Sequence, residues 1–285
     1  MKTIQQAGYT VLELMIVIAV SAGMFGIVAT TFSGRQQQVQ FTQAVRDLDS
    51  RIKDIRNDVS LGYYSANESV TCTTNNGNNP EPIVNDVGPG SADPLGSNED
   101  CVYIGKALQF SPGGNNNFNA DNDQLMKIFN IVGLRVDGNG SNPTSVADAV
   151  PTAIPNPEQA LLKWGLRVKS IRYTNNANVV SETNGIAIFT RLNRGSDLQV
   201  SASDEAVQVS AMPNVSADSS ESSMRSEIRL IGDNLLNGTM NLNNASSIVM
   251  CVSDAEDNRK ATITFGGSIS GSVIDFDNFN AADCS

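Results

Sequence analysis

Glu13 is the one charged residue in a run of 24 residues, 9–32, that is otherwise uncharged and largely apolar. A carboxylate inside a membrane-spanning helix costs about 3 kcal/mol unless a partner neutralises it. Cleavage of the chain between Gly8 and Tyr9 would create an α-amine one helical turn before Glu13, and the amine of a neighbouring subunit could approach the same carboxylate. If the chain is cut at this position, an ion pair between Glu13 and that amine would set the register of the subunits.

The four cysteines are the other residues that could form a metal site or a disulfide, and they are too widely spaced for a CxxC metal or redox pair. Disulfides are the favoured interpretation, and these form in an oxidising compartment. Cys72 and Cys101 enclose 28 residues, and Cys251 and Cys284 enclose 32. Four cysteines allow three connectivities. We favour pairing of the sequence neighbours, in which each bridge would contribute about 3–4 kcal/mol to stability.

The composition excludes several functional classes. The chain has no histidine, so the commonest general base and metal ligand is missing, and it has no phosphate-cradling glycine loop. We therefore predict no catalytic residue, no enzyme activity and no cofactor. A net charge of −11 argues against binding to nucleic acid. Two acidic segments, 115–123 and 275–283, could offer oxygen ligands to calcium, but solvated turns are the favoured interpretation.

The apolar run that contains Glu13 predicts a membrane helix. At 1.5 Å per residue a helix over 9–32 is about 36 Å long, and the hydrocarbon core of a bilayer is about 30 Å thick. The alternative is a secretory signal peptide, in which an apolar core would follow the charged start at once. A carboxylate within the core favours the membrane helix over that alternative.

A second pattern follows the apolar run and predicts that the helix continues to residue 61 as an amphipathic stalk. Apolar residues recur at spacings of three and four, which places them on one helical face: Phe41, Val45, Leu48, Ile52, Ile55 and Val59. Acid-first pairs four residues apart, Asp47 with Arg51 and Asp49 with Lys53, would support an exposed helical surface. A coiled-coil seam is the alternative, but packing of this stripe against the protein's own head is favoured because the stripe is short.

The rest of the chain predicts a β-rich head. A loop rich in Asn, Gly, Pro and Ser covers 73–99, and a linker rich in Pro and Gly covers 137–157. Short alternating segments bounded by turn residues predict strands at 102–110, 125–136, 166–173, 186–192, 198–202, 206–211, 227–231, 246–252, 261–265 and 272–276. The expected fold class is α+β, with a long N-terminal helix packed on one or two antiparallel sheets.

Residues 8–20, GYTVLELMIVIAV, resemble the processing site of type IV prepilins and of type II secretion pseudopilins. The resemblance implies that a prepilin peptidase cuts after Gly8 and methylates the new terminus at Tyr9, and that Glu13 assists filament assembly. It also implies a pilin-like head. Tyr9 stands where the family usually has phenylalanine. Gly23 and Gly26 stand where many major pilins have a proline, and they could let the helix melt locally because glycine costs about 1 kcal/mol relative to alanine.

The resemblance implies a structural subunit of a type IV pilus used in adhesion, twitching motility or cell contact. The length of the chain favours a minor or specialised pilin. The expected partners are other pilin subunits, the prepilin peptidase, the pilus assembly platform and the membrane. The precursor would lie in the cytoplasmic membrane as a single-pass protein, and the mature chain in a surface filament. A secretion pseudopilin and a membrane-anchored extracellular binding module are the alternatives.

These expectations divide the chain into six segments. They are a leader peptide at 1–8, a hydrophobic helix at 9–33, an amphipathic stalk at 34–61, the first part of the head at 62–136, the linker at 137–157 and the second part of the head at 158–285.

Overall fold

A computed structural model shows an α+β protein. Contacts divide the chain into two compact units, Met1–Gln43 and Ala44–Ser285, and we call the second one the head unit. The structure describes residues 10–62, 70–74, 81–86, 101–110, 124–135, 141, 143, 146, 148–174, 179–190, 207–216, 219–236, 248–266 and 269–276.

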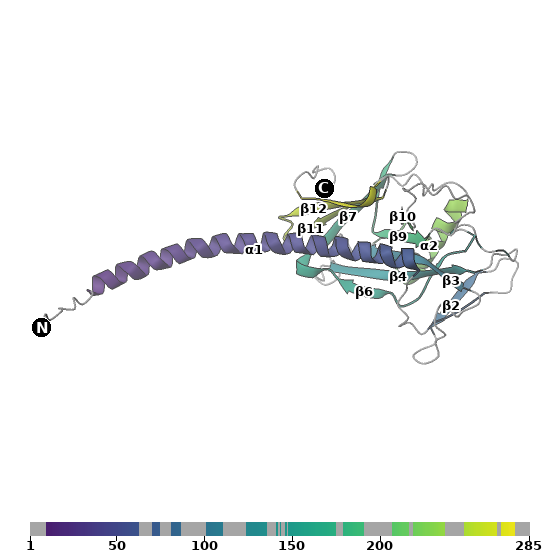
Figure 1. Cartoon of the computed structure of the whole chain (residues 1–285), viewed down its shortest axis with the longest axis horizontal. Helices are drawn as coiled ribbons and strands as arrows, with labels where there is room; N and C mark the ends of the chain where they lie inside the picture. Colours follow the sequence, from purple (N-terminus) through teal and green to yellow (C-terminus); the bar gives the residue numbers. More distant parts are fainter. Residues whose placement is uncertain are drawn as a thin grey trace. The chain divides into compact units, whose positions relative to one another are not determined.

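The first helix, α1, spans Val11–Leu61 (Figure 1). No proline interrupts these 51 residues, so every turn keeps its hydrogen bonds. The helix ends at Gly62, which has φ +68° and donates its N–H to the carbonyl of Val59 at 3.2 Å. Glycine is the usual residue at such an end because it has no Cβ to clash in the left-handed region. The observed helix agrees with the one predicted over 9–61.

An antiparallel six-stranded sheet forms one part of the head unit. Its strands are β3 (Cys101–Phe110), β4 (Leu125–Leu134), β5 (Thr152–Ala153), β6 (Glu158–Leu161), β9 (Gly185–Thr190) and β10 (Val207–Ala211). The order is β10-β9-β3-β4-β5, and β6 also pairs with β4. The central strands β3 and β4 are buried along nearly their whole length. Such continuous burial requires cover on both faces of the sheet.

A five-stranded antiparallel sheet has the order β13-β12-β11-β7-β8. Its strands are β7 (Arg167–Thr174), β8 (Val180–Thr183), β11 (Ile248–Ser253), β12 (Lys260–Gly266) and β13 (Ile269–Asp275). A short 3₁₀ turn, η2 (Lys163–Gly165), precedes β7. A third sheet contains β1 (Val70–Thr74) and β2 (Pro82–Asp86).

The second helix, α2 (Glu221–Leu236), corrects the predicted strand at 227–231. Ser220 caps its start, because its hydroxyl accepts the N–H of Ser223 at 3.2 Å. Met224, Ile228 and Ile231 recur at helical spacing and are fully buried. The prediction failed because it considered only a five-residue window, in which a helix face and a buried strand cannot be told apart.

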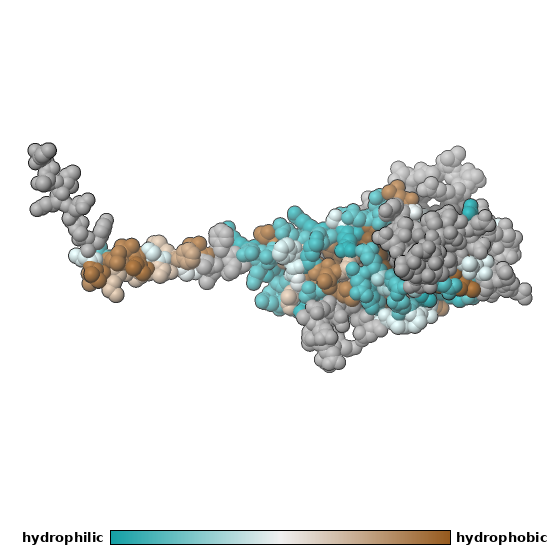
Figure 2. Space-filling model, turned by 90° about the horizontal axis from the view of Figure 1, so that it is seen from below, coloured by the Kyte–Doolittle hydropathy of each residue, from teal (hydrophilic) through white to brown (hydrophobic). Residues whose placement is uncertain are grey.

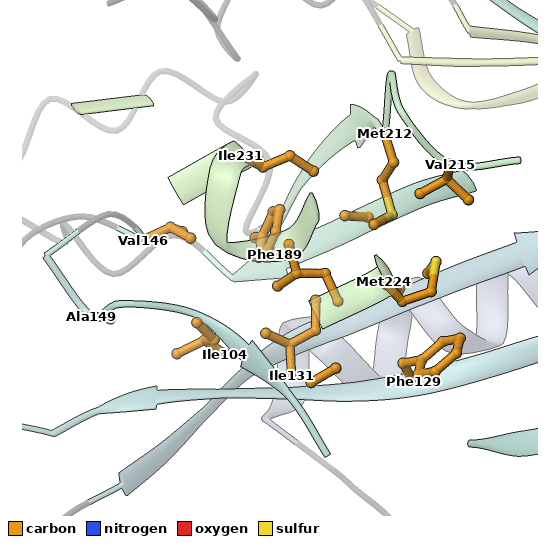
Figure 3. Packing of buried hydrophobic residues seen from close by; sticks show 14 residues of the cluster. Ile104, Phe129, Ile131, Val146, Ala149, Phe189, Met212, Val215, Met224 and Ile231 are labelled. Atoms are coloured by element: carbon orange, nitrogen blue, oxygen red, sulfur yellow. The ribbon is translucent and has the colours of Figure 1, made fainter. Parts of the chain in front are cut away.

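The two faces of the six-stranded sheet are covered by different helices. Ala107 lies opposite Phe129 and Ala187 in the strand register, so these three share a face. They form one hydrophobic cluster with Met224, Ile228 and Ile231 of α2, and Figure 3 shows the helix side chains gathered over those of the strands. Lys106 points to the opposite face and forms an ion pair with Asp58 of α1. The second part of α1 therefore covers the face that α2 leaves open.

The other predicted strands overlap observed ones, except 198–202, which lies outside the described residues. The loop predicted at 73–99 contains β2. The segment predicted as a linker, 137–157, contains β5 and the buried residues Val146, Ala149, Ala153 and Ile154. These residues contribute to the core as well as connecting strands.

Gly105 allows β3 and β9 to approach closely. A Cβ added at this position would lie 2.2 Å from the carbonyl oxygen of Ile188. The register of β3 against β4 also shifts between Tyr103 and Gly105, which marks a bulge. The centre of the sheet therefore requires glycine here.

Candidate functional site

The residues that the sequence predicts to be functional cluster at the start of α1. Gly8 and Tyr9, the predicted cleavage and methylation residues, lie outside the described residues. Thr10 is the residue before the helix, and its side-chain oxygen accepts the N–H of Glu13 at 3.3 Å while its carbonyl accepts the same N–H at 3.1 Å. Thr10 is therefore the N-cap of α1.

The Thr10–Glu13 contact reveals a role of Thr10 that the sequence prediction missed. Thr-x-x-Glu before an apolar run is the capping-box pattern, in which the threonine side chain accepts a hydrogen bond from the backbone N–H of the residue three positions later. Glu13 lies in the first turn of α1, where the helix dipole favours a negative charge. Glu13 thus has a local structural role available besides an ion pair between subunits, and an experiment must separate the two.

The first part of α1, Val11–Val28, has no buried residue. Val11–Val28 is long and apolar enough to cross a membrane by length and composition, as is also true of signal sequences, and none of its residues is buried. Figure 2 shows hydrophobic residues along this helix. Glu13 is exposed among them. A carboxylate and the surrounding apolar side chains are therefore available to a membrane or to another protein.

Gly23 and Gly26 lie on this exposed stretch. A Cβ added at either position would meet nothing within 4 Å. Neither glycine is required by packing within the chain, so any requirement for them must come from outside it or from the flexibility of the helix. The predicted role in local melting stays a prediction.

The second half of α1 has the opposite character. All six residues of the apolar stripe are buried: Phe41, Val45, Leu48, Ile52, Ile55 and Val59. Ala44 is also buried between them. In the head unit the stripe is thus covered by the chain itself, which leaves no exposed seam for a coiled coil along residues 44–59.

Ion pairs attach the polar sides of this half-helix to η2 and to the six-stranded sheet. The ammonium of Lys163 in η2 lies 2.8 Å from a carboxylate oxygen of Asp47. The guanidinium of Arg51 lies 3.2 Å from a carboxylate oxygen of Glu158 in β6. The prediction had paired Asp47 with Arg51, and it missed these long-range partners because spacing along one helix carries no information about other elements.

Asp49 has the local partner that the spacing predicts, since Lys53 donates to it at 2.7 Å. It also accepts the hydroxyl of Ser272 on β13. Asp49 is buried, and a buried carboxylate needs such partners to offset its desolvation. This contact attaches the edge of the five-stranded sheet to α1.

Two residues of β3, Lys106 and Tyr103, interact with Asp58 near the C-terminal end of α1. Lys106 is buried and donates to Asp58 at 2.8 Å. Burial raises the pKa of the Tyr103 hydroxyl well above its ordinary value, and the negative charge of Asp58 adds to the rise. Sequence spacing gave no sign of the pair of Lys106 and Asp58, because its members are 48 residues apart and lie on different elements.

Cys101 and Cys251 are both disulfide-bonded. Cys101 packs in a cluster that includes Val84 of β2, and Val84 is the register partner of Cys72 in β1. The backbone at Cys72 is thus brought to the neighbourhood of Cys101, and the pairing of these two cysteines stays a prediction. Cys284 lies outside the described residues, so the pairing of Cys251 with it stays a prediction.

The two segments considered for calcium, 115–123 and 275–283, lie outside the described residues apart from Asp275 and Phe276. Within the described part of the chain no three metal-ligating side chains come together. The start of α1 is therefore the strongest candidate site. Comparisons with protein-family models, curated proteins and solved structures find no match.

Proposed function

We propose that this chain is a subunit of a type IV pilus. In this proposal the precursor is held in the cytoplasmic membrane by the apolar half of α1 and is cleaved after Gly8 and methylated at Tyr9 by a prepilin peptidase. The assembly platform then packs the mature chain with other pilin subunits into a surface filament. The observation that carries the proposal is Glu13, a single carboxylate on an exposed apolar helix that begins next to the predicted cleavage site.

The contrast between the two halves of α1 supports this proposal. The half within the head unit is buried by the sheets, whereas none of Val11–Val28 is buried. An exposed apolar helix is suited to a membrane before assembly and to other apolar helices after it. One helix can therefore serve as an anchor in the precursor and as a packing element in the filament.

The head unit favours a minor or specialised subunit. It carries two large sheets and a third, two-stranded sheet, where the sequence pattern predicted one or two sheets. A larger head offers more surface for contact with a target cell or substrate. No group in the proposal acts as a catalyst.

The proposal is tested by comparing two substitutions in the full-length chain. Glu13→Gln removes the charge but keeps the backbone N–H that Thr10 caps, and we expect it to leave the protein processed and membrane-bound but poorly assembled. Thr10→Ala removes the cap, at a cost of about 1 kcal/mol to the helix end, but keeps the carboxylate. We expect it to retain most filament yield.

Filament yield is measured by shearing cells and quantifying the subunit in the sheared fraction. Equal defects in Glu13→Gln and Thr10→Ala would point to the helix cap as the function of this pair. Normal assembly of Glu13→Gln would contradict the proposed ion pair between subunits.

A further inference from the structure

Arg35 is a second charged residue on the exposed part of α1, and the role proposed for Glu13 does not include it. Between Thr10 and Gln43, Glu13 and Arg35 are the only charged residues, and they have opposite signs. Both side chains are exposed, and neither forms an ion pair with any residue that the structure describes. The exposed part of the helix therefore carries one anion and one cation that are both unpaired within the chain.

Glu13 and Arg35 lie on the same side of α1. Arg35 follows Glu13 by 22 positions, which is about six full turns at 3.6 residues per turn. The helix is continuous over this distance, because α1 spans Val11–Leu61. A rise of 1.5 Å per residue separates the two residues by about 33 Å along the helix axis. One face of α1 thus carries a negative charge near its start and a positive charge further along.

Four large apolar side chains lie on this face between the two charges. They follow Glu13 at alternating spacings of four and three residues, which keeps them on one side of a helix: Val17, Val20, Met24 and Ile27. More than half of the surface of each of these residues is exposed. The spacing is that of a face along which one helix packs on another. We call Glu13, these four residues and Arg35 together the α1 seam.

The α1 seam needs a partner that is apolar along its length and charged at its ends. Lipid covers apolar side chains, but it does not neutralise a carboxylate inside the hydrocarbon core, and an ionisable residue at that depth is expected to have a polar or charged partner. A second α1 meets both requirements, because it offers apolar side chains to the seam and the guanidinium of its own Arg35 to Glu13. The complementary charges therefore favour a second copy of this chain.

The direction of the second helix follows from the membrane anchor of the proposed function. An antiparallel pair would bring Glu13 to Arg35 at both ends and would close as a dimer. Copies that are anchored in one membrane by the same helix all point the same way, so they meet in parallel. Parallel copies bring Glu13 to Arg35 only when one is displaced by about 33 Å along the axis. Such a contact is heterologous, so it repeats from copy to copy and extends the assembly.

We propose that Arg35 of one copy of this chain is the counter-charge of Glu13 in a second, parallel copy that is displaced by about 33 Å along the helix axis. The proposal rests on the proposed function, which brings parallel copies into one assembly, and it names the residue that sets their offset. A carboxylate has two oxygens that accept hydrogen bonds. The terminal amine predicted at Tyr9 can therefore bind the same carboxylate.

The first test reverses the two charges in the full-length chain in producing cells, and it measures the subunit in the sheared fraction. Arg35→Glu and Glu13→Arg are each expected to lose most of the filament yield, because like charges then meet at the contact. The double exchange restores opposite charges and is expected to recover the yield. Arg46→Glu is the matched control, because Arg46 is another exposed arginine of α1 without an ion pair among the described residues. It is expected to keep the yield.

The outcomes separate this contact from the filament role. Normal yield in Arg35→Glu overturns the contact with Arg35 and leaves the filament role standing. A double exchange that recovers no filaments also overturns the contact, as does an equal loss of yield in Arg46→Glu. Absence of filaments from cells that produce the wild-type chain overturns the filament role and the assembly on which the contact depends.

A second measurement keeps both charges and reads the offset directly. Val17 and Val39 are both exposed and are 22 positions apart, so residue 17 of one copy meets residue 39 of the next at the proposed offset. Filaments are sheared from cells that produce the chain with Val17→Cys and Val39→Cys, and oxidation is expected to link the subunits into a ladder. Val17→Cys alone is the matched control and is expected to stay unlinked. Dimers of the control, which indicate helices in register, or a double variant without a ladder overturn the proposal.

Discussion

The ammonium of Lys106 lies 2.8 Å from a carboxylate oxygen of Asp58, and this ion pair joins the central strand of the six-stranded sheet to α1. The two partners differ in exposure, since the Lys106 side chain is 9% exposed and that of Asp58 is 33% exposed. Water can therefore solvate Asp58 if its partner is lost, but it cannot readily solvate Lys106. The pair holds the last turns of the helix on the sheet.

Removal of either partner is expected to have unequal effects. Asp58→Asn leaves a buried ammonium without its counter-charge and should cost about 3 kcal/mol of unfolding free energy. Lys106→Met replaces the ammonium with an apolar side chain of similar length and should cost about 1 kcal/mol. Denaturant unfolding of the full-length protein in detergent measures both values. A larger loss in Lys106→Met than in Asp58→Asn would contradict the burial described here.

We expect the buried hydroxyl of Tyr103 to make the free energy of unfolding fall at alkaline pH. Burial, with a contribution from Asp58, raises the pKa of its hydroxyl in the folded state above the ordinary value of 10.0. Above pH 10 the unfolded chain releases this proton while the folded chain keeps it, so the free energy of unfolding falls as pH rises. Unfolding measured between pH 8 and about 11 should show this slope, and Tyr103→Phe should reduce it. An equal slope in both proteins would assign the loss to other groups.

Gly105 and Gly23 form a matched pair of glycines with opposite expectations. Gly105→Ala forces a methyl group against the carbonyl of Ile188 and should lower the free energy of unfolding by about 3 kcal/mol. Gly23→Ala meets nothing in the chain and should favour the helix by about 1 kcal/mol. If local melting at Gly23 is used in the filament, the same change should reduce filament yield. Normal yield in Gly23→Ala would remove the melting hypothesis.

Disulfide connectivity can be read directly from peptides. Digestion without reduction should release one linked pair containing Cys72 and Cys101 and another containing Cys251 and Cys284. Reduction should then destabilise the head by about 3 kcal/mol for each bridge. Linked peptides that join Cys101 to Cys251 would show that the neighbour pairing is wrong.

A long-range ion pair attaches the start of β2 to α2. Glu81, which precedes β2, accepts hydrogen bonds from Arg229 of α2, and this hydrogen bond together with the positive charge lowers the pKa of Glu81. The sequence gave no sign of the pair, because 148 residues separate its members. Long-range partners of this kind are absent from any local pattern.

The repeat of apolar residues along the sequence predicted the buried face of α1 and several strands. The spacing of Val45, Leu48 and Ile52 identified the buried face of α1, since a helix repeats its faces every three to four residues. The alternating runs of β3 and β11 were found for the analogous reason. The single charge at Glu13 also needed no structure to be noticed.

Elements whose signal is spread over more residues were missed. The buried positions of α2 extend from Met224 to Ile231, beyond the five-residue strand that was predicted. The capping pattern of Thr10 and Glu13 is present in the sequence as Thr-x-x-Glu before an apolar run, but the prediction assigned Glu13 to filament assembly alone. The partners of α1 in other elements followed only from the fold. Examples are Lys163 of η2, which pairs with Asp47, and Glu158 of β6, which pairs with Arg51.

The mass of the mature N-terminus tests the central claim most directly. The chain should be isolated from cells that contain a prepilin peptidase, and its N-terminal peptide analysed by mass spectrometry. We predict that the chain begins at Tyr9 and carries one methyl group on its terminal amine. An intact Met1, or a start within the apolar run near Gly23, would contradict the proposed processing and the filament role that depends on it.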